Sequence, residues 1–290
     1  MKLATLNKNT KIVNTCHLDK NTEGEEFISD HVFSFQMTGN LTIHDGKNKY
    51  QFAPGDFRFS RRNSLLKFSK STPKQIKFES ISIYLNQAIL REVYQEWKQE
   101  VKPIKIEGKR VLALASHPLY ISYMESLLVY LNLSEEQQSA IMDLKIREAI
   151  WLLLRINPEI KEVLFDFSDP EKIDLKAFMI NNFRFNVRLE RFAYLTGRSL
   201  STFKRDFEKI FETTPRKWLL EKRLEEAYFL IKEKGKKANA VYLDVGFENL
   251  SHFSHAFKQH FGINASELNH LPTAVADRST AVKKGRLRKL

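Results

Sequence analysis

The stretch that decides the fold reads VRLERFAYLTGRS over residues 187–199 and LSTFKRDFEKIF over residues 200–211. Apolar residues recur at helical spacing before Gly197, and a glycine there can take the positive φ that ends a helix. Ser199 is then a good N-cap for the next helix. That helix has an inward face of phenylalanines at i, i+4 and i+8, namely Phe203, Phe207 and Phe211. The pattern predicts a helix, a tight turn and a second helix.

A second copy of this pattern follows later in the chain. It reads VYLDVGFEN over residues 241–249 and LSHFSHAFKQHF over residues 250–261. A short apolar helix again stops at a glycine, and Asn249 caps the helix that follows. The phenylalanines at 253, 257 and 261 repeat the first spacing after 50 residues. Two copies are too few for a solenoid, but they suffice for two DNA-reading heads.

The segment between the two copies is predicted to be a long helix. Thr214 and Pro215 supply its cap and its first turn. Its apolar face is wide enough to pack on both heads, through Trp218, Leu219, Leu224, Ala227, Leu230 and Ile231.

A helix that enters the major groove needs an apolar inner face and outward side chains that reach base edges. On the first predicted reading helix, Lys204 and Arg205 can both reach guanine O6 and N7, and arginine is the better bidentate donor. Ser201 can contact a base or a phosphate. The alternative is that all three are simply exposed helix residues.

Residues 174–268 resemble the C-terminal DNA-binding domain of AraC/XylS-type transcription regulators. The resemblance rests on Phe203-Lys204-Arg205, Phe207, Thr214-Pro215, Gly246-Phe247, Phe253, Phe257-Lys258 and Phe261-Gly262. It implies that the second head offers DNA the side chains of Asn249, Ser251, His252 and His255. The family usually has an arginine at the place of His255. Its closing Thr-Pro-Ser-x-Tyr-Arg stands here as residues 264–269, without the proline or the arginine.

The charge distribution is uneven. Of the formal net charge of +12, residues 1–170 carry +2, residues 171–270 carry +5 and residues 271–290 carry +5. A basic excess at one end of the chain is typical of a protein that binds a polyanion. We predict a sensor and dimerisation domain over residues 1–165, a DNA-binding domain over 166–271 and a disordered basic tail over 272–290.

The remaining composition is that of a cytoplasmic protein. A single cysteine, Cys16, excludes an internal disulfide framework. We expect no membrane-spanning helix, because the sequence has no apolar run of ~18 residues, and residues 1–20 lack the apolar block of a secretory signal.

Residues 25–85 are rich in β-branched and aromatic residues that turn signals separate. Asp45-Gly46 is a strong hairpin signal, and short strands at this spacing predict a small barrel or sandwich. The segment from Gly39 to Asp56 looks like the cupin-type sensor half found ahead of many such DNA-binding domains. The predicted fold class is therefore α+β, with an N-terminal cupin-like β-barrel and flanking helices, and an all-α C-terminal domain of two helix-turn-helix units joined by a long helix.

Three helices are expected after the barrel, over residues 87–99, 119–131 and 134–155. The resemblance implies that helices here pair two copies of the chain, and packing on the chain's own barrel is the equal alternative. Pro158 and Pro170 break the helical pattern before the DNA-binding domain.

The predicted barrel contains residues that could form a metal site or an anion site. Enzymatic cupins hold a metal with a His-x-His pair, which this chain lacks; His31 and His44 are read as surface or strand-end residues. His252 and His255 lie at i, i+3 but have no evident third ligand. A basic cluster formed by Arg58, Arg61, Arg62, Lys67 and Lys70 is read as an anion-binding mouth or, as is more usual, a solvated surface.

These observations predict a sequence-specific transcription regulator, an activator, that an effector bound at the N-terminal domain controls. Its expected partners are double-stranded DNA, RNA polymerase, a small-molecule effector and a second copy of the chain. No catalytic residue, metal or cofactor is expected, and the effector residues are not identified. The alternatives are a cupin-type enzyme with an accessory DNA-binding domain, and a regulator gated by a protein partner.

Overall fold

The computed structural model describes residues 12–17, 21–73, 76–97, 109–131 and 135–268. The predicted tail over residues 272–290 lies outside them. The chain divides into two compact units, Met1–Asp169 and Pro170–Leu290.

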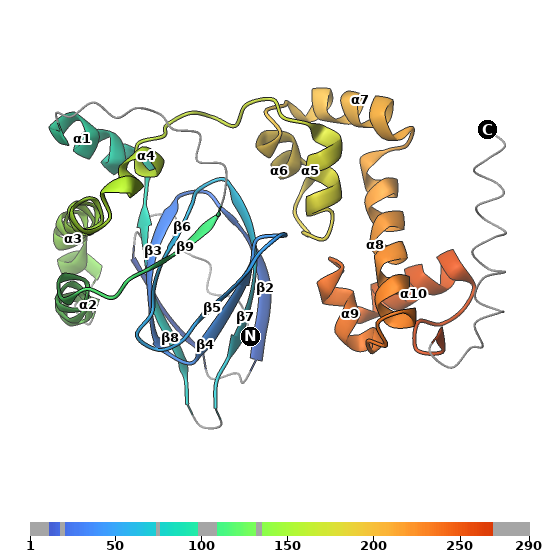
Figure 1. Cartoon of the computed structure of the whole chain (residues 1–290), viewed down its shortest axis with the longest axis horizontal. Helices are drawn as coiled ribbons and strands as arrows, with labels where there is room; N and C mark the ends of the chain where they lie inside the picture. Colours follow the sequence, from blue (N-terminus) through green and yellow to red (C-terminus); the bar gives the residue numbers. More distant parts are fainter. Residues whose placement is uncertain (1–11, 18–20, 74–75, 98–108, 132–134, 269–290) are drawn as a thin grey trace. The chain divides into compact units, whose positions relative to one another are not determined.

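The first unit contains two antiparallel sheets in its described part (Figure 1). The first sheet has the strand order β1 (Ile12–His17), β8 (Phe78–Leu85), β3 (His31–Thr38), β6 (Phe57–Ser60) and β9 (Val111–Leu114). The second sheet has the order β2 (Asn21–Ile28), β7 (Ser64–Ser71), β4 (Asn40–His44) and β5 (Lys49–Phe52). No ladder joins the two sheets among the described strands, so the predicted barrel is not closed.

The hairpin predicted at Asp45-Gly46 is confirmed by the pairing of β4 with β5. Asp45 accepts hydrogen bonds from the backbone N–H groups of Lys47 and Asn48, at 3.0 and 2.7 Å. Gly46 takes the positive φ of +93° that the turn requires.

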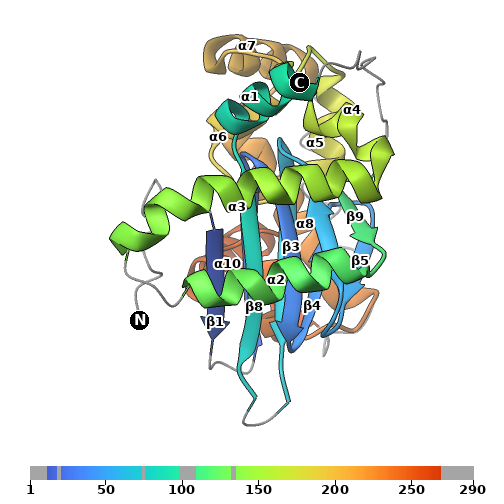
Figure 2. The same ribbon diagram turned by 90° about the vertical axis from the view of Figure 1, so that its left-hand side faces the viewer.

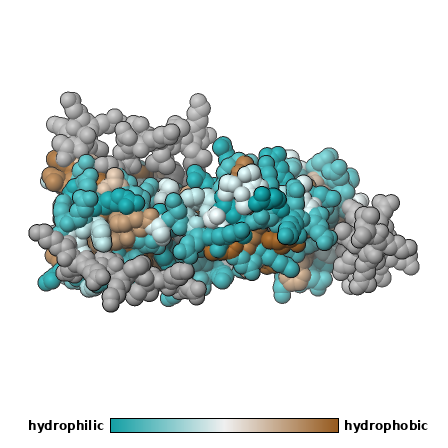
Figure 3. Space-filling model, turned by 90° about the horizontal axis from the view of Figure 1, so that it is seen from above, coloured by the Kyte–Doolittle hydropathy of each residue, from teal (hydrophilic) through white to brown (hydrophobic). Residues whose placement is uncertain are grey.

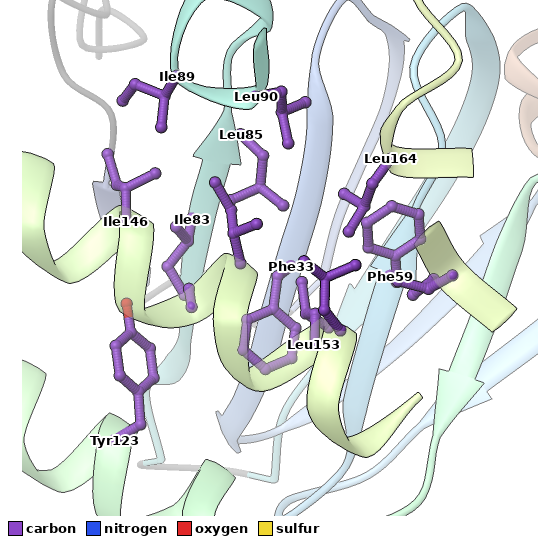
Figure 4. Packing of buried hydrophobic residues seen from close by; sticks show 14 of the residues in the cluster. Phe33, Phe59, Ile83, Leu85, Ile89, Leu90, Tyr123, Ile146, Leu153 and Leu164 are labelled. Atoms are coloured by element: carbon purple, nitrogen blue, oxygen red, sulfur yellow. The ribbon is translucent and has the colours of Figure 1, made fainter. Parts of the chain in front are cut away.

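Helices cover one face of the first sheet. They are α1 (Gln87–Trp97), α2 (Pro118–Leu131), α3 (Glu135–Ile156), the short 3₁₀ helix η1 (Pro158–Ile160) and α4 (Lys161–Leu164). Figure 2 shows α2 and α3 lying across the strands. Side chains alternate along a strand, so every second residue of β3, β6 and β8 points at these helices. Phe33, Phe59, Ile83 and Leu85 are fully buried there (Figure 4).

His31 lies at a strand end, as one of its two predicted placements had it, but it is not a surface residue. It begins β3 but is buried, and its ring stacks on Phe59 with centroids 5.3 Å apart. Its Nδ1 accepts a hydrogen bond from the backbone N–H of Arg62 at 3.2 Å. Burial, and next the charge of Arg62, lower the pKa of this imidazole to about 3, so it is neutral. His31 is therefore a core residue at the end of its strand.

The second unit is helical throughout its described part. It comprises α5 (Leu175–Asn182), α6 (Leu189–Leu195), α7 (Leu200–Phe211), α8 (Pro215–Lys232), α9 (Ala238–Asp244) and α10 (Leu250–Phe261). The helix-turn-helix pairs predicted on each side of a long joining helix are confirmed as α6 with α7 and α9 with α10.

The joining helix α8 serves both pairs. Near its start, the Trp218 ring lies 5.6 Å from Phe207 and 4.7 Å from Phe211 of α7, between ring centroids. In its later turns, Leu224 and Ile231 are fully buried with Phe253 and Phe257 of α10. Each pair thus has its own aromatic core against one part of α8.

Two glycines in this unit share the same backbone angle and differ in their surroundings. Gly197 and Gly235 both take φ of +64°. A Cβ at Gly197 would lie 2.4 Å from backbone atoms of Glu171 and Lys172, whereas a Cβ at Gly235 would meet nothing within 4 Å. The turn of the first pair therefore needs glycine for space as well as for φ.

We expect Gly235→Ala to lower the free energy of unfolding by about 1–2 kcal/mol, the cost of a left-handed alanine. Gly197→Ala should lower it clearly further, because the backbone at residues 171–172 must also move. Urea unfolding followed by helical circular dichroism measures both. Equal losses in the two variants would show that the close contact at Gly197 carries no energy.

Candidate nucleic-acid interface

The first pair presents a polar face opposite its aromatic core. Phe203 and Phe207 are fully buried on α7, and Ser201, Lys204 and Arg205 are exposed. The helix begins where predicted, because the Ser199 hydroxyl accepts from the backbone N–H of Thr202 at 3.2 Å.

Arg205 extends into solvent while its neighbour is held in place. The Arg205 side chain is 78% exposed and lies 3.9 Å from Oδ1 of Asp206. The other carboxylate oxygen of Asp206 accepts from Nε of Arg198 at 3.1 Å, and the Arg198 side chain is only 6% exposed. The hydrogen bond from Arg198 lowers the pKa of Asp206. The carboxylate is thus already engaged, and the Arg205 guanidinium is available to a ligand.

Arg198 itself was not predicted as an important residue. Its Nη1 donates to the carbonyl oxygens of Ile173 and Thr196, at 3.0 and 2.7 Å. It therefore fixes the turn between α6 and α7. The sequence signal that could have identified Arg198 is its position directly after the turn glycine, Gly197.

The second pair repeats this arrangement. Phe253 and Phe257 are fully buried on α10, and Ser251, His252 and His255 are exposed. Asn249 is the N-cap, and its Oδ1 accepts from the backbone N–H of His252 at 2.7 Å. The carboxamide oxygen of Asn249 is therefore committed to the helix, which leaves the amide NH₂ as its outward donor.

A concavity with a volume of about 740 Å³ lies between the two helix pairs. It is lined by Lys204 from α7, by Asn249 and His252 from the second pair, and by residues of α8. Ser201, Arg205, Ser251 and His255 are exposed but are not part of this lining. The structure thus brings three of the seven predicted site residues to one concavity and leaves four on the outer faces of the helices.

Three further arginines of this concavity were missed in the sequence. Arg188 precedes α6, Arg216 lies in the first turn of α8 and Arg223 lies further along that helix, and all three line the surface. Two acidic residues, Glu190 and Glu248, line it as well. Arg216 and Arg223 are seven residues apart on α8 and so share a face, which was the only sequence signal for this group.

Arg223 ties the two helix pairs together. Its Nε donates to the carbonyl oxygen of Phe183 (2.9 Å), its Nη2 to that of Phe185 (2.8 Å) and its Nη1 to that of Gly246 (2.9 Å). Phe183 and Phe185 lie between α5 and α6, and Gly246 is the turn glycine of the second pair. One guanidinium on the joining helix therefore fixes the approach to the first pair and the turn of the second.

Gly246 is also confined by its neighbours. It takes φ of +96°, and a Cβ there would lie 2.5 Å from the carbonyl oxygen of Arg184. Beside it, the Asn186 Nδ2 donates to Oε1 of Glu248 at 2.8 Å. Glycine is required here because the backbone of the first pair's approach passes too closely for a side chain.

No group of three or more His, Cys, Asp or Glu side chains suited to a metal ion occurs among the described residues, and this includes the neighbourhood of His252 and His255. In the described part of the chain, no helix is both long enough and apolar enough to cross a membrane.

The chain is similar to known regulators in both units. A family model described as a helix-turn-helix domain matches residues 192–270, and one described as the ExsA N-terminal regulatory domain matches residues 31–164. The HTH-type transcriptional regulator ExsA of Pseudomonas aeruginosa is 24% identical over 262 residues, which cover 88% of this chain and 92% of that protein. The virulence regulon transcriptional activator VirF of Yersinia enterocolitica is 22% identical over 235 residues, covering 80% and 86%.

Among solved structures, a crystal structure of an apo ToxT variant from Vibrio cholerae aligns over 91% of this chain and 99% of that chain. Its sequence identity is 15% and its TM-score 0.44.

We expect Arg223→Lys to lower the free energy of unfolding by about 1–3 kcal/mol. A lysine ammonium keeps the charge but cannot reproduce the planar fork that serves three carbonyl oxygens. Arg216→Lys is the matched control, since it makes the same change on the same helix face at an exposed position, and it should stay within about 0.5 kcal/mol of the parent. Urea unfolding measures both. Equal effects would mean that the carbonyl contacts of Arg223 do not stabilise this unit.

Proposed function

The chain belongs to the AraC/XylS family of DNA-binding transcription regulators, and on this premise we propose that α7 and α10 are the helices with which it reads duplex DNA. One observation carries the proposal. Each helix is anchored by two fully buried phenylalanines four residues apart and exposes polar side chains on the opposite face. The segment that contains both helices, residues 171–270, has a formal net charge of +5, as a polyanion-binding surface requires.

In this proposal the two helices contribute differently. On α7, Arg205 donates to guanine O6 and N7, Lys204 contacts a base or a phosphate, and Ser201 assists at the start of the helix. On α10, Ser251, His252 and His255 face the groove. Asn249 caps the helix and turns its amide NH₂ outward. Arginine is the strongest bidentate reader in this set, so the first helix carries more sequence information than the second.

The concave surface between the helices fits the sugar-phosphate backbone that passes between two successive major-groove segments. Three of its basic lining residues, Arg188, Lys204 and Arg216, serve as phosphate contacts. Such contacts set register and affinity but carry no sequence information.

We infer that the protein activates transcription, as the name of VirF states for that relative, and therefore acts with RNA polymerase. The first unit, which the regulatory-domain model matches, controls this activity. Two facing antiparallel sheets are compatible with a cupin-like arrangement. The relatives are transcription regulators, and nothing observed favours the enzyme alternative.

A second copy of the chain is the proposed partner of the helical face of the first unit. Seen from above, the surface is mostly hydrophilic with a few apolar patches (Figure 3). Exposed large apolar side chains on α2 and α3 are Leu119, Ile121, Val129, Leu144 and Trp151. These exposed apolar side chains on two helices support a partner for this face.

We expect Arg205→Ala to weaken binding at one or two base positions by about 1–3 kcal/mol and to relax specificity there. Arg205→Lys is the informative control, because it keeps the positive charge and removes the fork. It should relax specificity in the same way while the salt dependence of binding stays that of the parent. Binding-site selection on each variant measures this. An Arg205→Ala protein that keeps the parental base preferences would place α7 outside the groove.

The length of α8 makes a geometric prediction. Its 18 residues span ~27 Å at ~1.5 Å per residue, near the ~34 Å that separates successive major-groove faces. One chain should therefore protect two patches about ten base pairs apart on one side of the duplex. Footprinting with the parent, Arg205→Ala and His255→Ala tests it. The two variants should each lose protection in a different patch; loss at the same bases would contradict the two-headed arrangement.

A further inference from the structure

The first sheet carries polar side chains on the face that it turns toward the second sheet. Along β3, β6 and β8, the residues that alternate with the helix-facing core include Val32, Phe78 and Tyr84 and six smaller or charged polar residues: Ser34, Gln36, Arg58, Ser60, Ser80 and Ser82. Of these six, all but Ser82 are buried, and Arg58 is only 5% exposed. The space between two packed sheets is ordinarily filled with apolar side chains. The hydroxyls of Ser34 and Ser82 hydrogen-bond each other at 3.0 Å, whereas a buried guanidinium costs folding free energy unless an opposite charge compensates it.

A small cavity lies at these residues. Its volume is about 120 Å³, and both sheets line it. Arg58, Tyr84 and serines come from the first sheet, and Glu26 and Lys70 from the second. The rest of the lining is largely apolar and comprises Ile28, Val32, Leu41, Ile43, Leu66, Phe68 and Phe78. The cavity thus combines cationic groups with a hydrocarbon wall.

Arg58 is held in place but keeps its charge. Its Nη1 donates to Oε1 of Gln36 at 3.3 Å, and its guanidinium carbon lies 5.6 Å from the Phe52 ring centroid. Gln36 is itself fixed, because its Nε2 donates to the carbonyl oxygen of Thr38 at 2.7 Å. Burial lowers the pKa of Arg58 to about 10, so it remains protonated at neutral pH.

The second cation and the one acidic group come from the other sheet. The Lys70 Nζ lies 5.1 Å from the Phe68 ring centroid and 5.0 Å from that of Phe78. Burial, and next the Arg58 charge, lower the pKa of Lys70, and burial raises the pKa of Glu26. The formal charges of Arg58, Lys70 and Glu26 add to one positive charge at this cavity.

We propose that this cavity is the receptor site for a short-chain monocarboxylate, with the carboxylate on Arg58 and Lys70 and the alkyl group against the apolar wall. The inference rests on the proposed function, in which the first unit controls the DNA-binding unit, and it gives the effector a chemical class. The Tyr84 hydroxyl adds a donor, since burial raises its pKa to about 12 and keeps it protonated.

Charge selects the monocarboxylate. One negative charge neutralises the net formal charge of the cavity, whereas a divalent anion would leave an excess negative charge in a desolvated site. The guanidinium fork matches the two oxygens of a carboxylate. A neutral amide of the same shape would leave the cations uncompensated.

Size limits the alkyl chain. The cavity of about 120 Å³ equals the share of about four waters in the liquid and falls below the ~300–1,000 Å³ of pockets that hold larger ligands. An acid of about two to four carbons fills it. A long-chain fatty acid is too large to lie wholly inside it.

The test uses the full-length protein with sodium butyrate at constant ionic strength, measured by titration calorimetry and by thermal unfolding. Butanamide is the neutral match for butyrate, and sodium sulfate is the divalent comparison. We expect butyrate to bind and to raise the unfolding temperature, and both comparison compounds to have no effect. Equal binding of butyrate and butanamide, or tighter binding of sulfate, would overturn the proposal.

Variants separate charge recognition from damage to the fold. Arg58→Gln and Lys70→Met should each weaken butyrate binding by about 30-fold or more. Glu26→Gln removes the negative charge that opposes the ligand and should therefore tighten butyrate binding. A partly unfolded variant would bind butyrate more weakly, so damage to the fold cannot produce this result. Lys67→Met is the matched control, because Lys67 lies on the same strand and pairs with Glu25 at 2.6 Å but does not line the cavity; it should bind butyrate as the parent does. Weaker binding by Glu26→Gln would sink the charge argument.

The same preparations are tested for binding to a duplex obtained by binding-site selection. Proteins that bind DNA but not butyrate would refute the receptor site and leave the proposed function standing. If the parent binds butyrate as described but no duplex, the proposed function fails while the cavity assignment holds.

Discussion

The first sheet is buried on both of its faces, and this constraint determines most of the architecture of the first unit. Side chains alternate across a strand, so β3, β6 and β8 supply two interiors at once. One set of alternate residues, including Phe33, Phe59 and Ile83, packs under α1, α2 and α3. The other set faces the second sheet and includes Ser34, Arg58 and Ser80. The helical side therefore carries the apolar burial that stabilises the unit, which frees the space between the sheets for polar groups that a simple sandwich could not tolerate.

In the second unit the corresponding constraint is the joining helix. A helix-turn-helix pair of this size has little core of its own, because α6 and α9 have seven residues each. Each pair completes its aromatic core against α8, with Trp218 in one and Leu224 in the other. Arg223 then links both pairs through backbone carbonyls. Orientation is thus set by main-chain contacts that do not depend on the outward side chains, so those side chains can vary without disturbing the scaffold.

Much of the second unit could be predicted from the sequence, because its information is local. Glycine, a polar cap and phenylalanines at helical spacing specify each pair, and Ser199 and Asn249 cap their helices as expected. The sequence could not show that Arg223 reaches carbonyls about 40 residues earlier in the chain, since such contacts depend on how the helices pack. The exposure of Lys204, Arg205 and His255 follows from periodicity, whereas their contact with DNA remains a prediction.

The first unit was harder for a physical reason. Strict alternation of apolar and polar residues usually means a strand with one wet face, and Phe57-Arg58-Phe59-Ser60 reads in that way. The structure buries both faces, so Arg58, expected in an anion-binding mouth or on a solvated surface, lies between the sheets. Lys67 of the same predicted cluster instead pairs with Glu25. The alternation of apolar and polar residues cannot by itself distinguish a solvent-exposed sheet face from a buried polar one. The distinction depends on a second sheet, whose strands lie elsewhere in the sequence.

The two units therefore use arginine in opposite physical states. Arg205 is 78% exposed, so it is largely hydrated before it meets a ligand, and its attraction to a polyanion is screened by salt. Arg58 has already lost most of its water on folding, and burial has lowered its pKa to about 10. The free energy needed to remove water from this guanidinium was therefore spent on folding, and it is not spent again when an anion binds. An exposed arginine suits a large, highly charged partner that must be released readily. A buried one suits a small ligand of a single charge, whose binding changes the internal electrostatics of the fold that encloses it.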